Sequence, residues 1–377
     1  MSLPPGLLQW THEVSTHLPH LSHPQAVVLA WWSYGIATTR CCGLTTVATF
    51  LALLRSERAN TVRQRLREWC YDAQDKSGRQ RQAVPVGTCF APLLGWIVAW
   101  WSPAIPRLAL ALDATTLGQA FTVLAVCVVY NRCSIPVAWV VLRGDQAGSW
   151  RPHWEGLLAR IAPAIRSHWQ VVVSADSGLY AKWLYQAISA YGWHPYLRLS
   201  GQGYFRSAAG QRWRPLVDAA RRGGALRRWD AVCFKTQACQ LRCTLLAWWA
   251  ADQAVPWLIL TDLAPRQAQL AWYGLRAWIE TGFKYTKRGG WHWEQSKMRD
   301  PQRVERLWLA MAVATLRVVS LEPALPSSLL PALPTSLSVF RRGWLYHLVL
   351  QIKQQPLPVG RFIPSPWPDD RLLTLLC

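Results

Sequence analysis

The chain has 377 residues, of which 51% are apolar, so it is large enough to bury a core and too long for one typical domain. Lysine and arginine number 41 against 20 acidic residues, which gives a net charge of +21. An excess this large destabilises the compact state unless a polyanion neutralises it, and nucleic acid is the favoured polyanion. The alternative is surplus arginine that serves solubility alone.

The ten cysteines contain no Cys-x-x-Cys pair, and most lie in apolar surroundings. They indicate buried, reduced side chains of a cytoplasmic protein and argue against a disulfide framework. Cys239 and Cys243 would need two further metal ligands that the sequence does not show, so a packing role is favoured. The first twenty residues lack the basic and apolar regions of a secretory signal.

Residues 1–106 are predicted to form a helical, DNA-binding N-terminal domain. Its basic segment, 55–81, suits a DNA-binding unit and a solvated amphipathic helix equally well. The uncharged stretch 82–106 has an unbroken apolar core of about half the ~20 residues that a membrane span needs, so a buried helix is the better interpretation. The alternative interpretation of this stretch is that it spans a membrane.

The next part, 107–199, is predicted to be the first half of a mixed α/β catalytic core. Its β-branched apolar runs predict strands, and two segments with helical spacing lie between the later ones. The predicted order is strands 107–116, 119–131 and 134–143, helix 149–168, strand 169–176, helix 179–192 and strand 194–200.

Residues 200–263 are predicted to form a β-rich insertion, which carries seven arginines and one acid between positions 206 and 228. A few of its tryptophans could stack on an unpaired base, although a core role is favoured for each of them: Trp213, Trp229, Trp248 or Trp249. The core resumes over 264–321, mostly as helix. Residues 322–377 are predicted to form a proline-rich C-terminal arm with a short helix at 341–353.

Three of the scarce acids need a reason for their positions. Asp113 lies in the first apolar strand, where an unpaired carboxylate would be costly. Asp176 ends the strand of 169–176, where it could equally begin a turn or cap a helix. Glu280 lies in the segment YGLRAWIETGFKYTK, 273–287. At 100° per residue, Tyr273, Arg276, Glu280 and Lys287 fall within a stripe of about 60°, opposite the apolar side.

Such acids on a first strand, a fourth strand and a later helix converge in an RNase H-like sheet, whose first and fourth strands are neighbours. Carboxylates beside a basic surface suit two Mg²⁺ or Mn²⁺ ions, which activate a nucleophile at phosphorus. The residues alone therefore predict metal-dependent phosphodiester chemistry. Helical ion pairs such as Arg276–Glu280 are the simpler explanation of any single pair.

The spacing of Tyr273, Arg276, Glu280 and Lys287 resembles the YREK signature of one large branch of bacterial DDE insertion-sequence transposases. LALDATTL, around Asp113, and SADSGLYAKWLYQAI, around Asp176, resemble the two aspartate motifs of that family. The resemblance covers roughly residues 60–320. The second motif has Leu179 where an aromatic residue is common.

This resemblance implies an RNase H-like core with a β-rich insertion, in which Asp113, Asp176 and Glu280 hold the metal ions. Tyr273, Arg276 and Lys287 would contact DNA phosphate. The enzyme would bind terminal inverted repeats, cleave the DNA, and join the 3′-OH ends to target DNA as a dimer in the synaptic complex. We expect a bacterial, nucleoid-associated protein. Another RNase H-fold nuclease or a non-catalytic DNA-binding derivative is the alternative.

Overall fold

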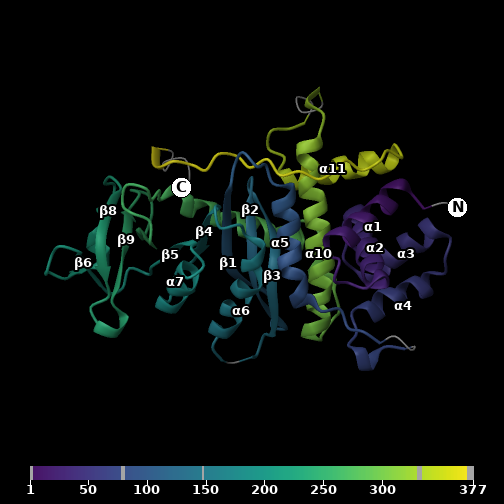
Figure 1. Ribbon diagram of the computed structural model, residues 1–377, viewed down its shortest axis with the longest axis horizontal. Helices are drawn as coiled ribbons and strands as arrows, with labels where there is room; N and C mark the ends of the chain where they lie inside the picture. The colour runs from purple at the N-terminus through teal and green to yellow at the C-terminus, as the bar shows by residue number, and fades with distance from the viewer. Residues whose placement is uncertain (1–2, 78–80, 147, 329–332, 372–377) are drawn as a thin grey trace.

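The computed structural model describes residues 3–77, 81–146, 148–328 and 333–371. Along its long axis, N-terminal helices lie at one end, the central strands in the middle, and the outer strands at the other end (Figure 1). The central helix α10 stands between the N-terminal helices and the sheet. The α-helices are α1 Pro5–His17, α2 His23–Thr39, α3 Leu44–Arg55, α4 Ala59–Trp69, α5 Val86–Trp100, α6 Arg151–Ile161, α7 Lys182–Ser189, α8 Ala271–Gly274, α9 Trp278–Thr286, α10 Pro301–Leu321 and α11 Val339–Ile352.

The N-terminal helices fold as their sequence predicts. In α2, Ser22 and Gln25 form a capping box, and twelve of the helix's seventeen residues are buried. The shorter α4 is amphipathic, because Val62, Leu66 and Trp69 recur at helical spacing and form its buried face. Arg63 and Arg67 lie away from that face and are exposed, whereas Arg65 is half-buried and pairs with Glu57.

All strands belong to one ten-stranded sheet with the order β3-β2-β1-β4-β5-β10-β9-β8-β6-β7. The strands are β1 Arg107–Leu117, β2 Phe121–Tyr130, β3 Cys133–Arg143, β4 Gln170–Ala175, β5 His194–Arg198, β6 Tyr204–Ser207, β7 Arg214–Pro215, β8 Arg227–Cys233, β9 Leu241–Trp248 and β10 Trp257–Thr261. Among the strand pairs in the described part of the chain, only β1–β4 and β4–β5 are parallel. The fold is therefore a mixed α/β structure with a mostly antiparallel sheet and an N-terminal helical region.

The parallel pairing of β1 with β4 positions the predicted site. Leu112 lies opposite Ala175 in the register of the two strands. Asp113 follows Leu112 within β1, and Asp176 directly follows the end of β4, so the two acids lie side by side at the carboxyl end of β4. Hydrogen bonding between the strands thus brings together two acids that are far apart in the sequence.

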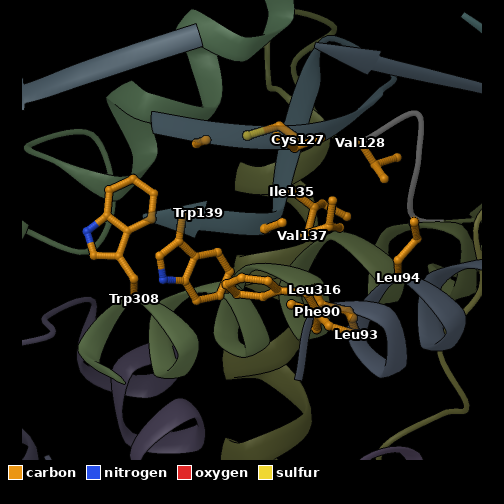
Figure 2. Close-up of a cluster of buried hydrophobic side chains, with 14 of the residues drawn as sticks. Phe90, Leu93, Leu94, Cys127, Val128, Ile135, Val137, Trp139, Trp308 and Leu316 are labelled. Carbon is orange, nitrogen blue, oxygen red and sulfur yellow. The ribbon is translucent and has the colours of Figure 1, made fainter. Parts of the chain in front are cut away.

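Both faces of β2 and β3, at one end of the sheet, are covered, because nearly every residue of these strands is buried. Helices α5, α6, α9 and α10 all contact β3. Figure 2 shows Phe90 and Leu93 of α5 and Trp308 and Leu316 of α10 beside Trp139 of β3. The uncharged stretch of 82–106 is thus a buried helix, α5, as its sequence predicts.

The predicted insertion continues the core sheet, because β10 pairs antiparallel with β5. Two of its strands, β6 and β7, were not predicted, since they have only four and two residues. The strand β8 begins at Arg227 and includes two arginines. The domain boundaries drawn from the sequence remain predictions.

The segment of 273–287 is helical but not one regular helix. A 3₁₀ turn at Leu275–Ala277 separates α8 from α9. Helix α9 passes through Gly282 and ends at Thr286, so Lys287 lies just outside it. Gly282 allows α9 to approach β3 closely, since a Cβ there would overlap the side chain of Ser134.

The C-terminal arm runs from α11 across the top of the molecule to the outer strands (Figure 1). Leu357 exchanges hydrogen bonds with Gln9, and Phe362 forms a bridge with Trp101. At the far end, Asp370 pairs with Arg228 and accepts a hydrogen bond of 2.8 Å from the Ala271 amide. The arm therefore contacts all three parts of the fold. Its last residues, 372–377, with Cys377, and part of its proline-rich run, 329–332, lie outside the described residues.

One helical segment, Pro301–Ala324, is long and apolar enough to cross a membrane. However, 83% of its apolar window is buried inside the protein, as in the core helix of a globular domain. Burial against the sheet and against α2 accounts for its apolar character.

Candidate active site

The Arg276 guanidinium lies between the three acids that the sequence singles out. Its Nη2 atom is 3.6 Å from Asp113 Oδ2 and 3.4 Å from Asp176 Oδ2. Its Nη1 atom is 3.4 Å from Glu280 Oε1. The fold thus gathers three carboxylates around one positive charge, at the edge of the sheet where β1 and β4 come together.

Asp113 is the most enclosed of the three carboxylates, with 18% of its side chain exposed. Burial raises the pKa of Asp113, while Arg276 and the Ala114 amide, which donates to Oδ1 at 2.8 Å, act in the opposite direction. The neighbouring charges of Asp176 and Glu280 raise this pKa further. The site therefore holds more negative charge than Arg276 neutralises.

Asp176 begins a turn, one of the two local roles that its sequence allowed, and it also faces the site. Its Oδ1 atom accepts a hydrogen bond of 3.0 Å from the Gly178 amide, which forms a tight turn after β4. Its Oδ2 atom faces Arg276. The turn thus fixes the side chain with one oxygen directed into the site.

Glu280 lies in the first turn of α9 and is the most exposed of the three, with 68% of its side chain accessible. It forms the predicted i, i+4 pair with Arg276. Ile279 and Phe283 are the buried residues beside it, and α9 contacts β1, β2 and β3. Packing of its apolar side therefore turns Glu280 towards the two aspartates.

Lys287 also reaches this edge, although it lies beyond the end of α9. Its Nζ atom donates a hydrogen bond of 2.8 Å to Thr115 Oγ1, two residues after Asp113 on β1. Burial lowers the pKa of Lys287, and the charge of Glu294 partly offsets this. The lysine is thus anchored beside the carboxylates.

Tyr273 differs from its predicted position on an accessible stripe. Only 5% of it is exposed, and its ring packs against Trp257 at 5.3 Å. Burial raises the pKa of Tyr273, while Arg276 and a hydrogen bond with Arg198 lower it. The 3₁₀ turn changes the helical register between Tyr273 and Arg276, so the assumption of 100° per residue fails there. Its contact with DNA phosphate stays a prediction.

The donor chemistry suits a hard divalent cation, because the three side chains offer only carboxylate oxygens and carry surplus negative charge. Within the described ranges, no three His, Cys, Asp or Glu side chains are clustered closely enough to hold one ion. Arg276 occupies the space between the carboxylates. The chemistry of the three carboxylates therefore suits Mg²⁺ or Mn²⁺. The Arg276 guanidinium would have to move before an ion could occupy the space between them.

The tryptophans considered for base stacking mostly have structural contacts. Trp229 packs against Phe205 and donates a hydrogen bond to Ala219, and Trp248 packs against Trp257. Trp249 donates to the Gln253 carbonyl, and Trp213 lies beside the Arg206 guanidinium. Cys243 has its sulfur 3.8 Å from that of Cys233, in the buried part of the insertion. These contacts agree with packing roles.

Three site residues were missed in the sequence. Thr115 and Arg198 hold Lys287 and Tyr273, and Gly282 sets the distance between α9 and β3. The run ATT after Asp113 offered a hydroxyl as a weak signal for Thr115. No local pattern marks Arg198, because its partner comes from a distant helix.

A family model of the transposase DDE domain matches residues 106–317, which is more than half of the chain. No curated protein sequence matched this chain. The matched region begins just before β1 and ends within α10, so it contains all three carboxylates, Arg276 and Lys287. The chain therefore belongs to the transposase DDE domain family.

Proposed function

We propose that the protein is the transposase of a bacterial insertion sequence, with an RNase H-like catalytic core and the YREK signature at Tyr273, Arg276, Glu280 and Lys287. The observation that carries the proposal is the convergence of Asp113, Asp176 and Glu280 on Arg276. The strand order β3-β2-β1-β4-β5, with β1 parallel to β4, also supports an RNase H-like core. A net charge of +21 suits a DNA partner.

In this proposal Asp113, Asp176 and Glu280 hold two Mg²⁺ or Mn²⁺ ions. Such ions supply an activated water or hydroxyl nucleophile and stabilise the leaving oxygen of a phosphodiester. The Gly178 amide and the Ala114 amide keep the aspartates oriented before substrate arrives. Glu280 acts as a ligand and not as a general base.

Arg276 and Lys287 bind the phosphate next to the reacting bond. Arg276 has a planar fork that suits phosphate oxygens, and it would exchange its carboxylate contacts for that phosphate. Lys287 is held by Thr115 at the same edge, so it needs little reorganisation. Tyr273 is buried close enough to Arg276 to interact with its charge. The same proposal includes a direct contact between the Tyr273 hydroxyl and a DNA phosphate.

The substrates are double-stranded DNA at the terminal inverted repeats and at the target site. The reaction frees a 3′-OH by hydrolysis and directs it at a target phosphodiester. Joining two ends requires two sites, so we expect a homodimer in the synaptic complex, in the bacterial cytoplasm at the nucleoid. The helical region of 1–106 would contribute DNA binding.

Strand transfer tests this function. A labelled duplex with the inverted repeat that flanks the gene is incubated with protein, Mg²⁺ and a supercoiled target plasmid. A transposase transfers the label to the plasmid, and Asp176→Asn protein does not. Cleavage without transfer would support a nuclease of the same fold instead, and binding without cleavage would support a non-catalytic DNA-binding derivative.

A further inference from the structure

A basic cavity of about 720 Å³ lies between the N-terminal helices and the segment that follows the candidate active site. We call it the interdomain groove. It is formed by three stretches of chain that are distant in sequence, at the start of α3, along α4, and between Gln295 and the first turn of α10. Its lining residues are 41–46, Arg63, Arg67, Cys70, Tyr71, 295–300 and Arg303.

The groove carries five cations, and most of them have no acidic partner. In the part of the chain that the structure describes, the side chains of Arg63, Lys297 and Arg299 are exposed and form no hydrogen bond or ion pair. Arg67, one helical turn after Arg63, only faces the ring of Tyr71 at 5.8 Å. Four positive charges are thus free to meet a ligand.

The remaining charges of the groove are already engaged. Arg303 pairs with Asp75 at 3.2 Å and lies over the Tyr71 ring at 4.2 Å. Asp300, the groove's acid, accepts a hydrogen bond from the Arg303 amide and caps α10. Asp75 and Asp300 therefore both contact Arg303 and leave the other four cations of the groove uncompensated.

The two walls of the groove are held together independently of any ligand. Arg306 of α10 pairs with Asp72 and donates to the Cys70 carbonyl at 2.7 Å. The Cys42 amide donates to the Trp291 carbonyl at 2.7 Å. The groove is therefore a built feature, and binding there needs no assembly of its walls.

The groove also leads towards the three carboxylates. A smaller hollow shares residues 296–299 with it and extends to Leu117, Gly118 and Phe121, at the turn between β1 and β2. Lys287 contacts Thr115 further back along β1. Asp113 lies four residues before Leu117, about 13 Å along the strand. Lys297 and Arg299 line both hollows, together with one acid, Glu294, in the smaller one, so the groove and the start of the path to the site share these two cations.

We infer that the interdomain groove binds the sugar-phosphate backbone of duplex DNA on one side of the reacting phosphate. This inference rests on the proposed function, because it assigns a second contact to the same DNA. The cations are distributed over α4 and the segment 295–300, which suits an extended polyanion better than a single small anion. The helical region and the catalytic core would hold the duplex jointly.

The test measures how DNA binding depends on salt. A fluorescent duplex carrying the flanking inverted repeat is titrated with wild-type protein and with Arg63→Ala, Lys297→Ala and Arg299→Ala proteins, singly and combined, over a range of KCl concentrations. Each lost phosphate contact should reduce the slope of log K against log[KCl] by about 0.9. Affinity at low salt should fall accordingly, while melting temperatures stay unchanged.

Arg166→Ala is the matched control. Arg166 is also exposed, but it precedes β4, whereas Asp176 follows that strand, so it lies at the opposite edge of the sheet. Its removal should leave the slope unchanged. An Arg63→Lys protein keeps the charge and should keep the slope. If the combined variant folds and retains the wild-type slope, the groove does not bind DNA.

Two further measurements separate this inference from the proposed function. If the groove variants lower the slope but wild-type protein never cleaves, the groove stands and the transposase assignment fails. If wild-type protein transfers strands while the groove variants bind and cleave normally, the assignment stands and the groove inference fails. The inference also fails if the groove substitutions reduce the salt slope for single-stranded RNA but leave the salt slope for duplex DNA unchanged.

Discussion

Arg276 links the three acids that the sequence singles out, and its contact with DNA phosphate stays a prediction. It contacts Asp113, Asp176 and Glu280, which come from β1, the end of β4 and α9. The sequence singled out those acids as candidate metal ligands because each lay where a carboxylate needs a cation or a hydrogen-bond donor. It also predicted the Arg276–Glu280 pair, since that pair is local. It could not predict that Arg276 would lie between the aspartates, because that depends on how α9 packs on the sheet.

Asp113→Asn and Asp176→Asn proteins should bind Mn²⁺ at least about tenfold more weakly than wild type, because each substitution removes an anionic oxygen ligand. Electron paramagnetic resonance of free Mn²⁺ measures this affinity without any turnover. Asp145→Asn is the control, since Asp145 is exposed and only approaches Arg143 at 3.9 Å. Equal affinities for all four proteins would remove the two aspartates from a metal site.

Gly282 tests the packing that directs Glu280. Gly282→Ala should lower the free energy of unfolding by about 1–3 kcal/mol, because its Cβ would overlap Ser134. Gly95→Ala in α5 should be neutral or stabilise by up to about 1 kcal/mol, since a Cβ there meets nothing within 4 Å. Ser134→Ala should recover part of the loss in the Gly282→Ala protein. Chemical denaturation of wild-type, Gly282→Ala, Gly95→Ala and Gly282→Ala/Ser134→Ala proteins measures these changes. Equal effects of the two glycine substitutions would refute the close approach of α9 to β3.

At the scale of elements, long periodic segments were predictable and short or irregular ones were not. The strands β1 to β4 follow apolar runs, in β2 to β4 rich in β-branched residues, and α5, α7 and α10 follow apolar periodicity. By contrast, β6 and β7 are too short to show a period. The residues before α9 include a 3₁₀ turn, and Tyr273 is buried there because Trp257 packs against it. Local periodicity cannot report a change of helix type that packing stabilises.

The junction of α11 with α2 and α10 should make the fold sensitive to acid. His347 is fully buried beside Thr38 and Arg317, and burial lowers its pKa to about 3. An unfolded histidine titrates near pH 6.5, so below that pH the unfolded state binds a proton that the folded state does not. Stability should therefore fall by about 2 kcal/mol from this group between pH 7 and pH 5.

Urea unfolding at several pH values checks this prediction. His347→Gln protein should lose that part of the pH dependence, although the substitution itself will reduce stability at pH 7. His12→Gln protein, altered at an exposed position, should unfold like wild type. A His347→Gln protein with the full wild-type dependence would contradict the assigned role.

At the scale of the whole molecule, the C-terminal arm joins parts of the fold that the sequence predicted as separate units. Gln9, Arg228 and Ala271 each contact it, and they lie in the helical region, in the outer strands and in the second part of the core. The continuous sheet also joins the core to the predicted insertion. Composition revealed the arm as proline-rich, but its contacts depend on the folded surface beneath it.

Phe362→Ala should therefore destabilise the whole protein by about 3 kcal/mol, because Phe362 is fully buried against Trp101 and Tyr130. The neighbouring Ile363 has 55% of its surface exposed and makes its contacts to Tyr130 through the backbone. Ile363→Ala should change stability by no more than about 0.5 kcal/mol. Calorimetry should show the larger effect in a single transition, and equal effects would mean that the arm is not packed on the core.

The central claim is that Asp113, Asp176 and Glu280 form a metal-dependent catalytic centre for DNA cleavage. The most direct measurement compares Mg²⁺-dependent cleavage of a labelled inverted-repeat duplex by wild-type and Glu280→Gln proteins, with DNA binding measured in parallel. Glu280 is exposed, so this change should not disturb folding. We predict that Glu280→Gln abolishes cleavage and leaves DNA affinity within about twofold of wild type, a difference below about 0.4 kcal/mol. Cleavage by Glu280→Gln protein at a near wild-type rate would contradict the claim.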